Sequence, residues 1–275
     1  MSFVAALVTI AALAQVNALV LSVSPLKPRQ GDTLAFHATL PDSKAAIITF
    51  RDRVVPMERL PDGRFRALFG TSPDMPPGLQ TVTVLGDDGG KTISFALTRG
   101  TFGVQRLRVP AARNQLRKDP RVDADKAAIR ACLAERTPDQ LWQGAFAWPV
   151  TGSIRTQYGL KRIMNGDANY GWHKGYDIAA KTGTPIKTPA DGIVALVRPC
   201  VLEGNLILVN HGQGVYTAYF HLSKFSVAEG QTIRTGERLG HVGNTGISSG
   251  PHLHWGVYVN GVAVNPKPWL TAPPK

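Results

Sequence analysis

The sequence is poor in cysteine. Only Cys132 and Cys200 occur among its 275 residues. They lie far apart and lack the short spacings of sulfur metal sites, which argues against zinc ligation by sulfur. Two roles stay open for the pair: two buried thiols or, if the protein is exported, a single disulfide.

A long apolar run is also missing. Residues 3–14 are apolar, but a helix that spans a membrane takes about 20 such residues. A run of this length suits the core of a signal peptide, and the small residues Ala14 and Ala18 offer cleavage sites. No Lys or Arg precedes the run, so an uncleaved anchor is the alternative. We therefore expect residues 1–18 to be a signal peptide or N-terminal anchor. This segment is then the only expected membrane contact of a periplasmic, extracellular or wall-associated protein.

Acidic residues are outnumbered, 19 against 31 basic ones, and the formal charge is +12. Such a balance favours anionic partners such as nucleic acid, acidic lipid or a polyanionic cell surface, unless it serves only solubility. Aromatic and basic residues are not interleaved, so we expect no nucleic-acid partner. The longest basic stretch, residues 106–121, contains Val109, Pro110 and Asp119. It is interpreted as a linker with a solvated helix face.

Between about residues 20 and 98, short runs alternate apolar with polar or small residues, which is typical of half-buried strands. These runs lie at 34–40, 46–50, 65–69, 81–85 and 93–97. Turns rich in Gly, Pro and Asp separate them. The pattern predicts an antiparallel β-sandwich over residues 19–100, which resembles the immunoglobulin-like modules of bacterial exported enzymes.

Residues 101–145 have a different character. Residues 123–135 predict a helix, with acidic residues in its first turn and one apolar stripe. We interpret the segment as a connector that packs against its neighbours and forms no site. From 146 to 275 the chain again alternates strands and glycine-rich turns, with no helix longer than a turn or two. The predicted fold is therefore mainly β, with a short helical linker between two β domains.

Histidine is concentrated in the last third of the chain. Six of the seven histidines lie between His173 and His254, and four of these six fall inside short motifs at 173–177, 219–222 and 250–255. Imidazole and carboxylate are the usual ligands of zinc, and spare histidines beside it serve as acid or base. The remaining histidine, His37, lies alone on a predicted strand, where a structural role is expected.

The spacing within these motifs predicts which side chains share a face. His252 and His254 lie two apart on an alternating strand, so both imidazoles face one cavity. In an extended segment His173, Gly175 and Asp177 also share a face, and the missing side chain at Gly175 would leave room for an ion. Two histidines and a carboxylate leave a fourth tetrahedral position for water, as in catalytic zinc sites. The helical His-Glu-x-x-His motif of other zinc peptidases does not occur.

Taken together, the three motifs resemble peptidase family M23, the lysostaphin- and LytM-like zinc endopeptidases of bacterial cell walls. The resemblance covers about residues 149–270 and implies a compact antiparallel β fold with one zinc ion in a groove. By this resemblance His173, Asp177 and His254 are the zinc ligands. His221 and His252 are the catalytic pair, and His211 and His241 match no ligand position. Tyr170 is a weaker candidate for stabilising an oxyanion.

The resemblance implies a zinc-dependent endopeptidase that uses a zinc-activated water to cleave the peptide stem or cross-links of bacterial peptidoglycan. The alternative is a catalytically silent wall-binding protein that regulates other peptidoglycan hydrolases. All five site positions keep their expected residues, which opposes this alternative. Peptidoglycan is accordingly the expected partner, and the N-terminal sandwich would either position the enzyme on the wall or occlude the groove.

Overall fold

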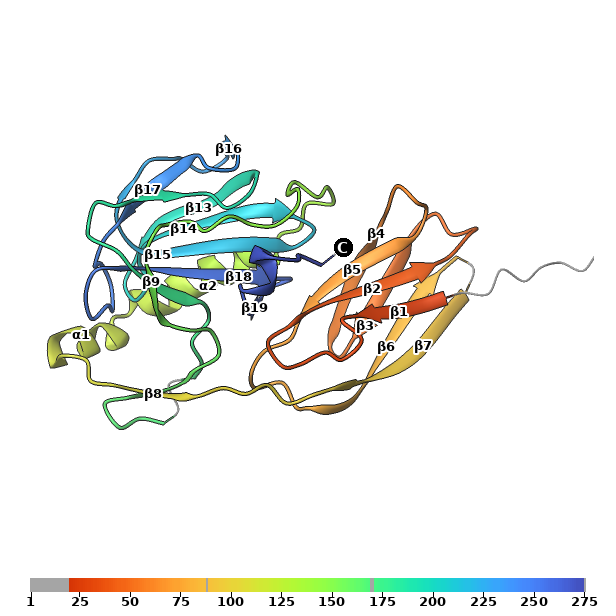
Figure 1. The fold of residues 1–275 in the computed structure, drawn as a ribbon, viewed down its shortest axis with the longest axis horizontal. Helices are drawn as coiled ribbons and strands as arrows, with labels where there is room; N and C mark the ends of the chain where they lie inside the picture. The colour runs from red at the N-terminus through yellow and green to blue at the C-terminus, as the bar shows by residue number, and fades with distance from the viewer. Residues whose placement is uncertain (1–19, 88, 169–170, 275) are drawn as a thin grey trace, which may run out of the picture.

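The computed structural model describes residues 20–87, 89–168 and 171–274, which form two β-rich regions side by side with a helical connecting segment (Figure 1). The fold is mainly β, as predicted. The predicted signal peptide or anchor, residues 1–18, and Tyr170 lie outside the described residues. Among the helices that are described, none has the length and apolar character needed to cross a membrane.

Seven antiparallel strands form the N-terminal region. They are β1 (Val20–Ser24), β2 (Thr33–Thr39), β3 (Ala46–Phe50), β4 (Arg53–Arg59), β5 (Phe65–Gly70), β6 (Gly78–Gly86) and β7 (Gly89–Leu97). Their order is β1-β2-β5-β4-β3-β6-β7. All seven contribute to one apolar core, in which Phe36 packs against the rings of Phe50, Phe69 and Phe95 at centroid distances of 5.7–6.0 Å. The immunoglobulin-like character of this region stays a prediction.

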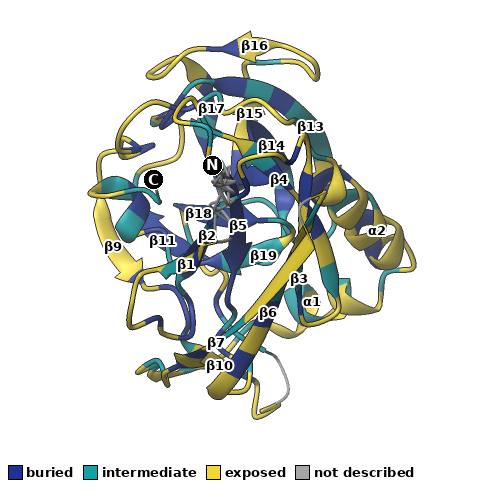
Figure 2. Cartoon of the chain, turned by 90° about the vertical axis from the view of Figure 1, so that its right-hand side faces the viewer, coloured by how far each residue is buried: buried dark blue, intermediate teal, exposed yellow. Residues whose placement is uncertain are grey.

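The C-terminal region is built on a sheet in the order β16-β13-β14-β15-β18-β11-β9. Its strands are β9 (Ser153–Thr156), β10 (Lys161–Met164), β11 (Tyr176–Ala179), β12 (Pro185–Lys187), β13 (Gly192–Cys200), β14 (Gly204–Gly212), β15 (Val215–Phe225), β16 (Thr232–Ile233), β17 (Arg238–Val242), β18 (His252–Val259) and β19 (Val262–Val264). The central strands β14 and β18 are almost wholly buried, and so is β15 from Val215 to Leu222 except for Phe220 (Figure 2). A 3₁₀ turn at Pro268–Leu270 closes the region, and no α-helix occurs among its described residues, as predicted.

The connecting segment contains β8 (Val104–Leu107), α1 (Ala111–Gln115), a 3₁₀ turn (Leu116–Lys118) and α2 (Arg121–Ala134). Helix α2 confirms the helix predicted over 123–135, with a start two residues earlier. It packs on β13, where the Asp125 carboxylate accepts hydrogen bonds from Arg198 Nε at 3.0 Å and Val201 N at 2.8 Å. Cys132 and Cys200 lie in the apolar cluster beneath α2 as two buried free thiols, which was one of the two predicted roles.

The two β regions meet at the end of β18 that is remote from His252. Trp269 Nε1 donates to Thr33 Oγ1 at 3.1 Å, and Asn260 Nδ2 donates to Leu68 O at 2.7 Å. Val259 lies seven positions after His252 on β18, which is about 23 Å at the usual strand rise. The interface therefore holds the N-terminal strands away from the histidines, and residues of the connecting segment approach them instead.

Candidate metal centre and active site

The three predicted ligands lie close to one point. Strands β11 and β18 are antiparallel neighbours that pair Asp177 with His254, and His173 reaches the same point from the turn before β11. His173 Nε2 and His254 Nδ1 lie 3.0 Å apart, and each lies 2.9 Å from Asp177 Oδ1. All three side chains are buried. The structure thus brings together His173, Asp177 and His254 as the sequence predicted.

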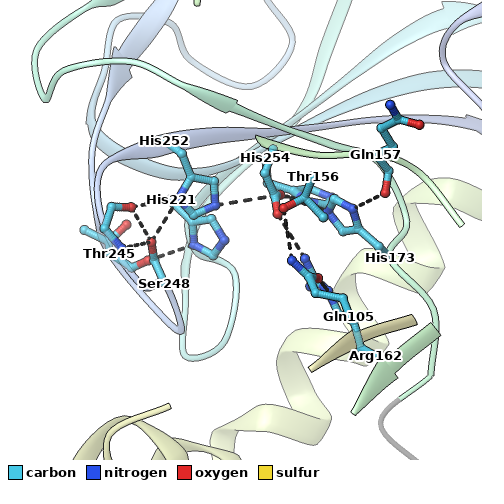
Figure 3. A network of polar contacts seen from close by, with 12 residues as sticks. Gln105, Thr156, Gln157, Arg162, His173, His221, Thr245, Ser248, His252 and His254 are labelled. Carbon is cyan, nitrogen blue, oxygen red and sulfur yellow. Dashed lines mark hydrogen bonds and ion pairs between the residues drawn. The ribbon is translucent and has the colours of Figure 1, made fainter. Parts of the chain in front are cut away.

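Hydrogen bonding sets the tautomer of His173. Its Nδ1–H donates to the carbonyl oxygen of Gln157 at 2.7 Å (Figure 3), so in the neutral ring Nε2 carries the lone pair that faces the cluster. Metal-binding histidines are usually oriented in this way by a second partner on the outer nitrogen. His254 is held differently: its ring stacks on Phe220 at 4.8 Å and 11°.

The donor set fits a divalent cation. A carboxylate oxygen only accepts hydrogen bonds, and His173 Nε2 carries a lone pair in the neutral ring. Two acceptor atoms, Asp177 Oδ1 and His173 Nε2, therefore face each other at the centre of the cluster. His254 Nε2 is buried with no hydrogen-bond partner among the described residues, which leaves its Nδ1 as the nitrogen with a role. Two imidazole nitrogens and one carboxylate oxygen are ligands typical of zinc.

The protonation of these groups favours metal binding. Burial raises the pKa of Asp177, but contacts with the His173 and His254 imidazoles outweigh that effect and hold the pKa well below its ordinary value. Burial lowers the pKa of His254 to about 4. At neutral pH the site therefore offers a carboxylate and a neutral imidazole, the forms that ligate metals.

The two remaining histidines of the motifs lie beside this cluster (Figure 3). His221 Nδ1–H donates to Thr245 O at 2.8 Å, and His252 Nδ1–H donates to Gly250 O at 2.8 Å. Each ring therefore keeps Nε2 for the cavity, and His252 Nε2 lies 3.7 Å from Asp177 Oδ1. The two rings are 4.8 Å apart, so the predicted catalytic pair faces one space next to the ligands.

His221 stands in an unusual backbone conformation. Its φ is +66°, a left-handed value that non-glycine residues adopt rarely and mostly at functional sites. The neighbouring residue Phe220 stacks on His254, while His221 turns toward His252. Burial, with the nearby His252 and His254, lowers the pKa of His221 to about 3, so the ring is neutral at physiological pH.

A second chain of contacts reaches the outer oxygen of Asp177. Arg162 Nη2 donates to Asp177 Oδ2 at 3.0 Å. Arg162 Nε donates to Gln105 Oε1 at 3.1 Å, and Gln105 Nε2 donates to Thr156 Oγ1 at 3.2 Å (Figure 3). Because β8 pairs in parallel with β10 and sets Gln105 beside Arg162, the connecting segment positions a candidate ligand.

The connecting segment also lines the candidate site, which corrects the interpretation that this segment forms no site. A small hollow of about 90 Å³ beside His252 is lined by the linker residues Leu107, Arg108 and Val109. A larger hollow of about 340 Å³ beside His254 is lined by Arg117 and Lys126. No local pattern predicts this arrangement, because the pairing of β8 with β10 joins residues 57 positions apart, as in Val104 and Lys161.

Gly175 has a different role from the predicted one. A Cβ at this position would lie 2.2 Å from the backbone oxygen of Trp255 and 3.0 Å from the Cα of Gly256. The missing side chain therefore allows β18 to approach the His173–Asp177 segment, and it leaves no space for an ion.

The other histidines lie outside the site. His211 is fully buried, with Nδ1 2.7 Å from Asp191 O and Nε2 2.8 Å from Thr217 Oγ1, so it is a structural residue away from the metal cluster. His241 lies on β17 and His37 on β2, both strands as expected. Neither lines the two hollows beside the metal cluster.

Comparison with known proteins places the site in a family. Residues 171–266 match the model of peptidase family M23. An uncharacterized metalloprotease of Haemophilus influenzae is 44% identical over 119 residues, which are 43% of this chain and 22% of that protein. The peptidoglycan DD-endopeptidase ShyA of Vibrio cholerae is 35% identical over 133 residues, 48% of this chain and 31% of that protein. The matches thus span less than a third of these curated relatives.

A solved structure extends the likeness beyond the matched domain. The crystal structure of a Pseudomonas aeruginosa protein assigned to the M23 peptidases is 27% identical, with a TM-score of 0.70 over 90% of this chain and 96% of that one. Its coverage includes the N-terminal strands as well as the β domain with the histidines. Residues 171–266 of this chain thus form a peptidase M23 domain.

Proposed function

We propose that the protein is a zinc-dependent endopeptidase that hydrolyses peptide bonds in the stem or cross-links of bacterial peptidoglycan. The observation that carries the proposal is the convergence of His173, Asp177 and His254 beside two histidines whose Nε2 atoms face the same cavity. The names of the relatives support the substrate, since two of them are peptidoglycan or DD-specific peptidases. An exported location follows from the same substrate.

One zinc ion would be held by His173 Nε2, Asp177 Oδ1 and His254 Nδ1. When bound, zinc polarises a carbonyl oxygen and makes a water acidic enough to attack near neutral pH. Asp177 supplies the negative charge of the ligand set, and Arg162 fixes its outer oxygen so that Oδ1 faces the cavity. The Gln157 carbonyl holds His173 in the tautomer that a ligand requires.

His221 and His252 would transfer the protons of the reaction. His221 donates its Nδ1–H to Thr245 O, so its Nε2 keeps the lone pair that can take the proton of the attacking water. His252 Nε2 faces the same cavity and lies 3.7 Å from Asp177 Oδ1. The ring that has taken the water's proton carries it on Nε2, from which it donates to the tetrahedral oxyanion or passes to the leaving amine.

The test combines metal analysis with hydrolysis of purified peptidoglycan. We expect one zinc per chain and release of new amino groups that a chelator abolishes. His221→Ala and His252→Ala should lose turnover and keep zinc, whereas His173→Ala and His254→Ala should lose the metal. His37→Gln, a histidine change outside the site, is the control. Zinc binding without hydrolysis of any peptidoglycan would refute the enzyme and leave the catalytically silent, regulatory alternative.

A further inference from the structure

The two hollows beside the metal cluster differ in charge. Both are lined by His221 and Arg162, so a peptide that runs from one to the other would pass over the histidines. The larger hollow, of about 340 Å³, adds three cationic side chains: Arg117, Lys126 and Lys174. One side of the reacting bond is thus lined by cations from two separate parts of the chain.

These cations are available to a ligand to different degrees. Lys174 follows the ligand His173, is exposed, and forms no ion pair with any described residue. Lys126 lies 3.7 Å from Asp123, whose side chain is 95% exposed and lies on the water side of α2. Arg117 lies 3.9 Å from Asp167. Such long, exposed pairs are weak, and a better-placed anion can displace them.

The acidic side chain among the lining residues is Glu203. Burial raises the pKa of its carboxyl group, and Lys174 and Lys126 oppose that effect. One partly buried carboxylate does not balance four cations, since Arg162 also lines the hollow, although Asp177 already engages it. The wall therefore keeps a net positive charge next to the metal cluster.

We propose that this hollow is a subsite for a free carboxylate of the peptide substrate, bound by Lys174 and Lys126 with support from Arg117. The proposal rests on the proposed function, because a peptide is expected in the two hollows only if the metal cluster and the histidine pair hydrolyse peptides. The anions that a peptide carries are carboxylates, and the hollow beside His254 is lined by four cations, whereas the smaller one is lined by Arg108 and Arg162 with the Asp177 carboxylate beside them. The protein would accordingly select peptides with a carboxylate near the cleaved bond.

The experiment compares two forms of one substrate. Cross-linked peptide dimers released from peptidoglycan are used either with free carboxyl groups or after conversion of these groups to primary amides. The two forms have nearly the same shape and differ in charge. We expect the wild-type kcat/KM to be about fivefold to tenfold higher for the carboxylate form, since each partly exposed charge pair contributes modestly. The preference should fall as salt rises.

Two double variants assign the preference to the hollow. Lys126→Gln with Lys174→Gln should reduce it to less than about twofold. Lys187→Gln with Lys224→Gln removes the same charge from exposed lysines that line neither hollow, and should leave it unchanged. Zinc content and Tm are measured for both, so that a loss of fold or metal is not read as a loss of selectivity.

Equal kcat/KM for the two substrates in the wild-type protein would overturn the proposal, and so would an equal effect of the two double variants. If neither substrate is hydrolysed, the proposed function fails, and co-sedimentation of the protein with native and amidated peptidoglycan decides the subsite. A preference for native material that only the Lys126/Lys174 variant loses would support it. Equal binding in all cases would refute it.

Discussion

Substitution of Gly175 by alanine tests how closely the ligand-bearing strands must pack. The new Cβ would lie 2.2 Å from the oxygen of Trp255, whereas ordinary contact begins near 3.4 Å. The two backbones must then separate by about 1.2 Å (3.4 − 2.2), because the obstacle is main chain and cannot rotate away. Overpacking of this kind costs about 1–3 kcal/mol, and we expect the upper end.

The same displacement should disturb the metal centre. Gly175 lies between His173 and Asp177, and β11 carries Asp177 against His254. Metal–ligand distances tolerate only about 0.2 Å, so a shift several times larger should weaken zinc binding by at least about 100-fold. At 2–4 °C for each kcal/mol, a cost of about 3 kcal/mol should lower the Tm by roughly 6–12 °C. Zinc affinity is measured by competition with a chromophoric chelator.

Gly250→Ala is the matched control. It makes the same substitution near the site, but a Cβ on Gly250 meets nothing within 4 Å and its φ is not left-handed. Its Tm and zinc affinity should stay close to wild type. If Gly175→Ala keeps the wild-type Tm within about 2 °C and binds one zinc with undiminished affinity, then the approach of β18 does not govern the ligand geometry and the reasoning is wrong.

Further predictions concern the surroundings of the site. Arg162→Gln should weaken zinc binding about 10–100-fold by freeing the outer oxygen of Asp177, whereas Lys161→Gln, its exposed neighbour, should not; equal competition titrations for both would contradict this. Arg66→Ala removes buried hydrogen bonds to Gln140 and Gln213 and should lower the free energy of unfolding by about 2–4 kcal/mol, while Arg64→Ala at an exposed pair leaves the denaturation midpoint unchanged. Burial lowers the pKa of His211 to about 4 from 6.5, so the unfolded state binds more protons between these values. Stability should therefore be full above pH 6.5 and fall by about 2 kcal/mol by pH 5; urea titrations in which His211→Asn shows an undiminished pH slope would refute this.

Much of the β structure could be predicted from local pattern. The alternation in 46–50 marks β3 because this strand buries one face, and the period of the apolar residues follows burial. The alternation in 34–40 marks β2 in the same way, although Thr33 and Ala35 on the other face of β2 are buried as well. Strand β4 was missed since Pro56 interrupts it and Val54 is exposed; proline normally argues against a strand. The tertiary pairing that buries its other residues is not encoded in a local window.

The site divides in the same way. The five histidine and aspartate positions could be predicted because they occur in short motifs with the spacing of strands and turns. Arg162 and Gln105 could not, since their roles depend on a parallel pairing between distant segments and neither lies in a recognisable motif. Gly175 was assigned the wrong purpose because a sequence shows that a side chain is missing but does not show which atoms occupy the space.

The parts of the site that motifs do not reveal bear on how this domain could be moved between proteins. The family match begins at residue 171, so a segment cut there would carry the three proposed metal ligands, His173, Asp177 and His254, and the proposed catalytic pair. It would leave behind the Gln157 carbonyl that orients His173, the arginine on Asp177, and the linker side of both hollows. A transplant that begins near residue 101 would keep them. The segment that carries the complete site is therefore longer than the segment that matches the family model.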